Sequence, residues 1–387
     1  MLGLGTLGIA QPNAPDPRLL RKKMFADQQR AALSQPLVGV RGSGGVTPGL
    51  FPIRATGVST EPVRAAAAAF LATLTQPQTL RTLFPADDDE WRRWSNVDNG
   101  LYTRLGTSLR EMSEPQRAAA FALMRASLSA KGLALSQAIM KTDQTLAEIN
   151  RDTLSYDELL YFFTVMGHPS ATEPWGWQID GHHLVINYFV LGGQVVMTPV
   201  FMGGEPVIAT TGKYAGNVVL QEEQDRGLAF MRRLSSAHQA AARLAAEKRG
   251  NDIKAQADAD NLVLEPQGVR ADDLPPEARA ALLELIRLYV ANLRDDQAQV
   301  RMTDVAAHLA ETRFAWVGGV SDDAVFYYRI HSPVILIEFD HQNPVGSTAI
   351  NPPGRPTRAH IHTVVRTPNG NDYGTDLLRQ HLAAHKH

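Results

Sequence analysis

Two strand-rich segments, with a helical region between them, most restrict the folds open to this chain. The first runs over residues 158–207 and the second over 313–366, and both are rich in aromatic and β-branched residues. Such residues favour strands, whereas the flanking regions carry helical patterns. Because two strand segments of one chain most simply pair with each other, we predict an α+β fold. It has a single, mostly antiparallel sheet with helices packed around it.

Turn signals indicate how the strands follow one another. In the first segment, HHLVINYFV and QVVMTPVF flank Gly192-Gly193, and a Gly-Gly pair supplies the positive φ that a hairpin turn needs. In the second segment, AVFYYRIH and PVILIEFD are separated only by Ser332. This tight connection predicts two antiparallel neighbours. RFAWVGG before them and RAHIHTVVR after them are expected to add two further strands.

Helix-start signals place most of the helices. Pro62 opens a helix that runs to about Leu74, because proline suits the first helical turn. Ser113 and Gln116 form a capping box, and we place the end of that helix at Gly132. Further helices are expected over residues 133–150, 222–234, 237–248 and 300–311, from residue 275, and near the C-terminus.

The chain divides into a tail and one domain. Residues 1–59 are expected to form a flexible N-terminal segment, and residues 60–387 a single α+β domain. RGSGGVTPG in the first segment has a loop composition, and no Gly-Lys-Ser/Thr follows to bind phosphate. The apolar start of the chain lacks the basic residues of an export signal, although cleavage after Ala10 is the alternative. Location therefore stays open between cytoplasm and export.

Composition excludes several classes of function. The chain has 387 residues and no cysteine, which excludes disulfides, thiolate nucleophiles, Cys-ligated zinc and iron–sulfur clusters. Its 38 basic and 40 acidic residues give a net charge of −2, so nothing indicates a nucleic-acid surface. No apolar run approaches the length of about 18 residues that a membrane-spanning helix needs. We expect a small-molecule partner, and the oligomeric state stays open.

The last strand carries the most informative pair among the 12 histidines. His360 and His362 are two residues apart, and side chains at i and i+2 of a strand point to the same face. Two imidazoles side by side can bind one metal ion. The alternative is a pair of ordinary surface or core histidines.

Two carboxylates lie near the end of an apolar strand. In PVILIEFD, Glu338 and Asp340 share a face, and a buried carboxylate is costly unless it is paired or liganded. Glu338 lies deeper in the apolar run and is therefore the stronger candidate ligand. The alternative is that the strand has simply reached solvent.

Adjacent histidines before the first hairpin supply a further candidate ligand. Alternation places His183 and Asn187 on one face of the strand, and His182 on the face with the apolar residues. We favour His183 as a ligand that lines a cavity with Asn187. The alternatives are that His182 is the ligand or is a hydrogen-bonded core histidine.

Other residues are candidates for contacts with a substrate. Arg329 sits among aromatic residues, and a buried arginine requires a partner such as Asp340 or an anionic group of the substrate. Trp175, Trp177 and Trp316 can form the walls of an apolar pocket, with Asn187 and Asp340 as polar members. Core packing is the alternative for each tryptophan, and an internal salt bridge is the alternative for Arg329.

Several long motifs resemble one known family. They are WGWQIDGHHLVINY, PVFMGGEPV, YYRIHSPVILIEFD, AHIHTVVR, LFPADDDEWRRWSNV and SEPQRAAAFALM, and they run from about Thr60 to the C-terminus. In this order they are similar to the DUF3500 family of proteins of unknown function. The resemblance implies one shared domain and supplies no reaction.

The residues themselves favour a metal-dependent enzyme, either a hydrolase or an oxygenase. A divalent ion (Zn, Fe, Cu or Mn) would activate water or dioxygen against a small organic substrate. The expected ligands are His360, His362 and Glu338, with His183 or His182. Arg329 would orient an anionic group of the substrate. The alternative is a non-catalytic protein that binds a small molecule or a metal.

Overall fold

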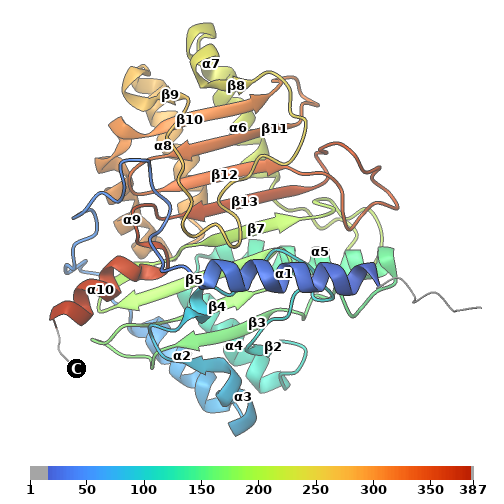
Figure 1. Cartoon of the computed structure of the whole chain (residues 1–387), viewed down its shortest axis with the longest axis vertical. Helices are drawn as coiled ribbons and strands as arrows, with labels where there is room; N and C mark the ends of the chain where they lie inside the picture. Colours follow the sequence, from blue (N-terminus) through green and yellow to red (C-terminus); the bar gives the residue numbers. More distant parts are fainter. Residues whose placement is uncertain (1–15, 385–387) are drawn as a thin grey trace, which may run out of the picture.

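Thirteen strands form one open sheet in the part of the chain that the structure describes, residues 16–384 of a computed structural model (Figure 1). The strand order is β1-β3-β4-β5-β7-β13-β12-β11-β10-β8, with β2, β6 and β9 paired to β3, β5 and β10. The predicted α+β class with one mostly antiparallel sheet is confirmed. The candidate cleavage position after Ala10 lies outside the described residues.

The first half of the sheet comes from the N-terminal strand segment and the short strands before it. Its strands are β1 (Leu83–Phe84), β2 (Thr107–Ser108), β3 (Phe162–Met166), β4 (Trp175–Asp180), β5 (Leu184–Leu191), β6 (Gln194–Val196) and β7 (Val200–Gly204). The Gly192-Gly193 turn joins β5 to β6 as the sequence predicts, and the pair is antiparallel.

The second half of the sheet comes from the C-terminal strand segment. Its strands are β8 (Arg243–Ala245), β9 (Val269–Arg270), β10 (Arg313–Gly318), β11 (Phe326–His331), β12 (Leu336–His341) and β13 (Ile361–Arg366). β11 and β12 are antiparallel neighbours, as the tight connection predicts. Antiparallel pairing of β13 with β7 joins the two halves, so residues far apart in sequence meet at the centre of the sheet.

Helices and irregular segments cover opposite faces of this sheet. The helices are α1 (Pro17–Leu33), α2 (Glu61–Thr73), α3 (Gln76–Thr82), α4 (Glu114–Ser127), α5 (Ala130–Asn150), α6 (Gln221–Arg233), α7 (Ser236–Ala242), α8 (Pro276–Val290), α9 (Asp295–Ala307) and α10 (Thr375–Ala384). The larger core lies on one face of the sheet. It contains apolar residues of α2, α4, α5, α6, α8 and α9. A smaller core on the other face is closed by loops around Val40, Phe51 and Ile253 and by α10. Among residues 16–384, no helix has the length and apolar character of a membrane span.

Three predicted helices differ from the structure, and one of them, expected over residues 300–311, is α9 at Asp295–Ala307. α4 ends at Ser127, and Gly132 lies in the first turn of α5. A Cβ on Gly132 would lie 2.1 Å from the carbonyl oxygen of Asn292, so this glycine allows a close backbone approach and does not end a helix. α7 stops at Ala242, because the chain continues as β8, which pairs with β10.

The segment expected to be flexible up to residue 59 contains regular structure and core residues. Helix α1 occupies Pro17–Leu33, and the side chains of Val40 and Phe51 are buried in the smaller core. The structure thus draws residues before position 60 into the domain. A loop composition is compatible with this, because a loop can bury isolated apolar side chains.

Candidate metal centre

Three central strands bring the candidate histidines to the same end of the sheet. His183 directly precedes β5, His360 directly precedes β13, and Gly203 lies at the end of β7. Since β7 is antiparallel to both neighbours, its end meets the beginnings of β5 and β13. His362 is the direct partner of Gly203 in the strand register, and the N–H of Gly203 donates to the carbonyl oxygen of His183 at 2.8 Å.

Gly203 makes room for the two histidines that flank it. A Cβ at this position would lie 2.9 Å from Cδ2 of His362 and 3.0 Å from Cδ2 of His183. Carbon atoms do not approach this closely without displacement. The missing side chain on β7 therefore lets the imidazoles of β5 and β13 converge across the strand between them.

The three imidazoles form a compact buried group. His183, His360 and His362 each offer a ring nitrogen, and these nitrogens all lie within 4.8 Å of one another. The Nε2 atoms of His360 and His362 are 2.8 Å apart. Two nitrogen ligands on one metal ion at right angles are about 3 Å apart, given metal–nitrogen bonds of about 2.0–2.1 Å. The spacing therefore suits a shared cation.

Hydrogen bonding selects the tautomer of His360. Its Nδ1 lies 2.7 Å from the carbonyl oxygen of Asn343, and a carbonyl oxygen can only accept. Nδ1 therefore donates, and Nε2 of the neutral ring keeps its lone pair for a cation or a donor. Among the described residues, Nδ1 of His362 has no hydrogen-bond partner. Without a cation, the contact between the two rings is a hydrogen bond in which His362 donates.

Asp143 of α5 holds the adjacent histidines. Its Oδ1 lies 2.9 Å from Nδ1 of His182 and 3.5 Å from Nδ1 of His183. Tyr161 donates to Oδ2 at 2.6 Å. Asp143, His182 and His183 form a second group with possible ligand atoms within 4.8 Å. A carboxylate behind a histidine fixes the orientation of the ring, as in many metal sites.

Glu205 lies behind His360 in the same way as Asp143 lies behind His182 and His183. Its Oε2 lies 3.3 Å from Nδ1 of His360. Its carboxylate also accepts hydrogen bonds from the backbone N–H groups of Val345, Gly346 and Ser347 and from the Ser347 hydroxyl. Glu205 therefore ties the loop after β12 to His360.

Burial keeps the cluster in the neutral form that binds metals. Burial lowers the pKa of His183 to about 4, with His182 adding to the effect and Asp143 opposing it. Burial also lowers the pKa of His360 despite the opposing charge of Glu205, and it lowers the pKa of His362 well below the usual range. Burial alone would raise the pKa of Glu205, but His360 and the Ser347 hydroxyl outweigh it and hold that pKa near 2.

Acid is expected to destabilise the metal-free protein through His183. Because its pKa falls from 6.5 to about 4 on folding, the unfolded state binds the proton first, and stability is lost as pH falls below 6.5. Between pH 7.5 and 5 this amounts to about 2 kcal/mol of unfolding free energy. Urea unfolding at both pH values, with a chelator present, measures this difference in unfolding free energy.

The control for this experiment is a histidine outside the cluster. The difference between the two pH values should shrink by about 2 kcal/mol in His183→Gln, and it should stay unchanged in His168→Gln, whose side chain is exposed. An equal pH dependence in wild type and His183→Gln would contradict the expected titration.

The structure does not bring the two strand carboxylates to the histidines. Glu338 accepts hydrogen bonds from the Tyr327 hydroxyl at 2.5 Å and from the backbone N–H groups of Lys254 and Ala255. Asp340 lies beside His362 in the strand register, yet its Oδ1 is 2.9 Å from Nζ of Lys248. Among residues 16–384, neither carboxylate belongs to a group of possible ligands that includes a histidine. Both are buried and paired within the protein.

The residues expected to contact a substrate are dispersed. Arg329 donates to the side chain of Gln267 at 2.9 Å. Asn187 donates to the carbonyl oxygen of Pro199 and accepts from Gln178. Trp175, Trp177 and Trp316 each donate through Nε1 to a neighbouring oxygen, and all three are fully buried. These tryptophans are residues of the larger core.

Asp143 and Glu205 were not among the residues predicted from the sequence, although each carries a signal. Asp143 lies on α5 between the core residues Ile139 and Leu146, at spacings of four and three residues. A carboxylate on the buried face of a helix needs a partner. Glu205 follows an apolar strand and two glycines, and its side chain is 1% exposed.

Comparison with known proteins yields one match. A family model described as a protein of unknown function, DUF3500, matches residues 56–375. No curated protein and no solved structure matches the chain.

Proposed function

Because the chain belongs to the DUF3500 family, whose description names no activity, we propose its function from its own buried histidine cluster. It is a metal-dependent enzyme in which His183, His360 and His362 hold one divalent ion. The observation that carries the proposal is the convergence of three neutral imidazoles whose ring nitrogens lie within 4.8 Å of one another.

The donor set narrows the choice of metal. Imidazole ligands suit zinc, iron and copper, whereas manganese favours carboxylates and water. The carboxylate proposed from sequence, Glu338, is engaged by Tyr327 and two backbone N–H groups. The proposal therefore leaves Glu338 out of the ligand set and favours zinc, iron or copper.

Three protein ligands favour catalysis over a purely structural role. Structural zinc sites are closed by four protein ligands, while catalytic sites use three and leave a position open. His182, the next candidate, instead forms a hydrogen bond with Asp143 at 2.9 Å. A metal ion held by the three histidines would supply Lewis-acid activation of a water molecule or, if the ion is iron or copper, redox activation of dioxygen.

The surrounding residues position the ligands and restrict access of water. Asp143 orients His182 and His183, and Glu205 with the carbonyl oxygen of Asn343 orients His360. Through Glu205, residues 345–347 are held close to the cluster. The substrate is a small organic molecule, since the three histidines are almost fully buried.

Elemental analysis of tag-free protein tests the proposal. About one equivalent of zinc, iron or copper is expected in the wild type. In His362→Ala we expect metal affinity to fall by at least about 100-fold, because the loss of a direct ligand exceeds the 10–100-fold typical of residues behind a ligand. The matched control is His331→Ala, another buried histidine of the sheet, which should keep its metal.

The outcomes separate the alternatives. Zinc would direct the search to hydrolysis, and iron or copper to oxidation by dioxygen. Absence of metal even after reconstitution would contradict the proposal and leave a hydrogen-bonded histidine cluster. A bound metal that admits no exogenous ligand, such as azide, would favour the non-catalytic metal-binding alternative.

A further inference from the structure

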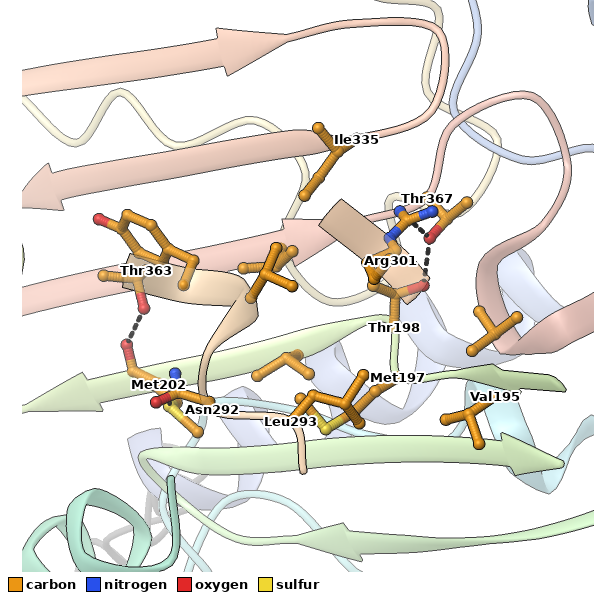
Figure 2. Close-up of a pocket in the computed structure, with 15 residues that line it drawn as sticks. Val195, Met197, Thr198, Met202, Asn292, Leu293, Arg301, Ile335, Thr363 and Thr367 are labelled. Atoms are coloured by element: carbon orange, nitrogen blue, oxygen red, sulfur yellow. Dashed lines mark hydrogen bonds between the residues drawn. The ribbon is translucent and has the colours of Figure 1, made fainter. Parts of the chain in front are cut away.

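A cavity lies on the face of these strands that is opposite to the histidine cluster. Figure 2 shows it between the sheet and the segment that follows α8, with residues of β6, β7, α9 and β13 around it. Thr363 and Met202 line it, and each is adjacent in sequence to a residue of the histidine cluster, His362 and Gly203. Because neighbouring residues of a strand face opposite sides, the cavity is separated from the histidines by the sheet.

The walls of the cavity are mostly apolar. The centre of a water-sized sphere can occupy about 50 Å³ of it, and the space beyond opens to solvent. The side chains of its walls are largely aliphatic, among them Val195, Met197, Leu293, Ile335 and Val365. A volume of this size takes a few water molecules or a thin alkyl chain. The small space and the aliphatic walls therefore favour an unbranched chain over a fused ring system.

One end of the cavity carries a cation without a carboxylate partner. Nη2 of Arg301 donates to the carbonyl oxygen of Val334 at 2.6 Å and to Oγ1 of Thr367 at 3.0 Å. No described carboxylate forms an ion pair with Arg301, since Asp304 pairs with Arg54 and Asp372 with Arg366. Burial lowers the pKa of this guanidinium, and the charges of Asp304 and Asp372 oppose that effect without forming an ion pair with it. A partly buried arginine of this kind suits a carboxylate of a ligand.

The other end carries an unused hydrogen-bond acceptor. Asn292 lines the cavity and is 4% exposed, and its Oδ1 accepts no hydrogen bond from the described residues. Its Nδ2 faces the sulfur of Met202 at 3.7 Å. In Figure 2, Asn292 lies at the end near Thr363, and Arg301 lies at the end near Thr367. Thr363 and Thr367 are four positions apart, which corresponds to about 13 Å of extended chain.

We propose that this cavity binds an unbranched organic monocarboxylate with a hydroxyl group at its far end. The carboxylate pairs with Arg301, the alkyl chain contacts the aliphatic walls, and the hydroxyl donates to Asn292. The site is independent of the metal centre, because it uses none of the histidines and lies on the other face of the sheet.

Isothermal titration calorimetry of the full chain with three probes tests the proposal. Octanoate should bind at least about tenfold more tightly than 1-octanol, because only the acid can form the charged hydrogen bonds to Arg301. 8-Hydroxyoctanoate should bind about threefold or more tightly than octanoate through Asn292. Equal affinities for octanoate and octanol would overturn the proposal. If 8-hydroxyoctanoate binds no more tightly than octanoate, the proposed contact between the hydroxyl and Asn292 is wrong.

A pair of variants assigns the charge to one residue. Arg301→Met keeps an unbranched side chain without the charge and should weaken octanoate binding by about tenfold or more, while binding of octanol stays unchanged. Arg287→Met on α8 removes an exposed arginine with the same change in net charge and should leave both affinities unchanged. Unaltered octanoate binding by Arg301→Met would overturn the proposal. The probe comparison on the wild type remains decisive if that variant does not fold.

Discussion

Gly203→Ala is expected to abolish metal binding by a protein that retains all three histidines. The new Cβ would lie 2.9 Å from the ring of His362 and 3.0 Å from the ring of His183, so both rings must move apart. Metal affinity depends steeply on ligand placement, and displacement of two ligands should cost at least about 100-fold. Metal content after dialysis and a competition titration with a chromophoric chelator measure this loss.

The adjacent glycine offers a matched control. A Cβ on Gly204 would lie 2.7 Å from Cγ2 of Val219, which is an equally tight contact on the opposite face of β7. Gly204→Ala should therefore show a comparable loss of stability but keep its metal. Equal metal content in the two variants would contradict the assignment of His183 and His362 to one ion.

Arg366→Met is expected to lower the free energy of unfolding by about 3–5 kcal/mol, because it leaves the buried Asp372 without its cation and leaves Asp260 with Arg92 alone. Arg366 is fully buried, and its guanidinium lies 2.8 Å from Asp260 and 3.2 Å from Asp372. It also donates to the carbonyl oxygens of Ala255 and Gln256. These contacts hold the segment around residues 255–260 against the smaller core.

Urea unfolding measures the effect of Arg366→Met, with Arg379→Met as the control. Arg379 forms an ion pair with Asp376 on the surface of α10, with its side chain 70% exposed, and its removal should change the unfolding free energy by less than about 1 kcal/mol. Equal stabilities of the two variants would show that the buried carboxylates do not depend on Arg366.

Local signals account for the part of the fold that the sequence predicts. The Gly192-Gly193 hairpin and the β11–β12 connection at Ser332 depend on a few neighbouring residues, and both are confirmed. The end of α4 was placed incorrectly, because Gly132 does not end that helix. It lies in the first turn of α5, where the absence of a side chain allows close contact with Asn292. Likewise, the extent of α7 is limited by the pairing of β8 with β10.

The candidate site divides in the same way. Strand alternation is sufficient to place His360 and His362 on one face, and the structure brings His183 to them. The sequence could not show which carboxylate contacts which histidine. Asp143 comes from α5 and Glu205 directly follows β7, so their contacts with the histidines depend on the tertiary structure. Glu338 looked like a ligand from its apolar surroundings, yet Tyr327 and a remote loop occupy its oxygens.

The sequence by itself determined the class of the fold, the faces of its strands and the chemical type of the candidate ligands, because periodicity and residue chemistry are local properties. Only the tertiary structure decided which ligands meet. The pairing of β7 with β5 and β13 sets Gly203 between His183 and His362. Such proximity depends on strand order, and strand order results from packing the whole chain around one core.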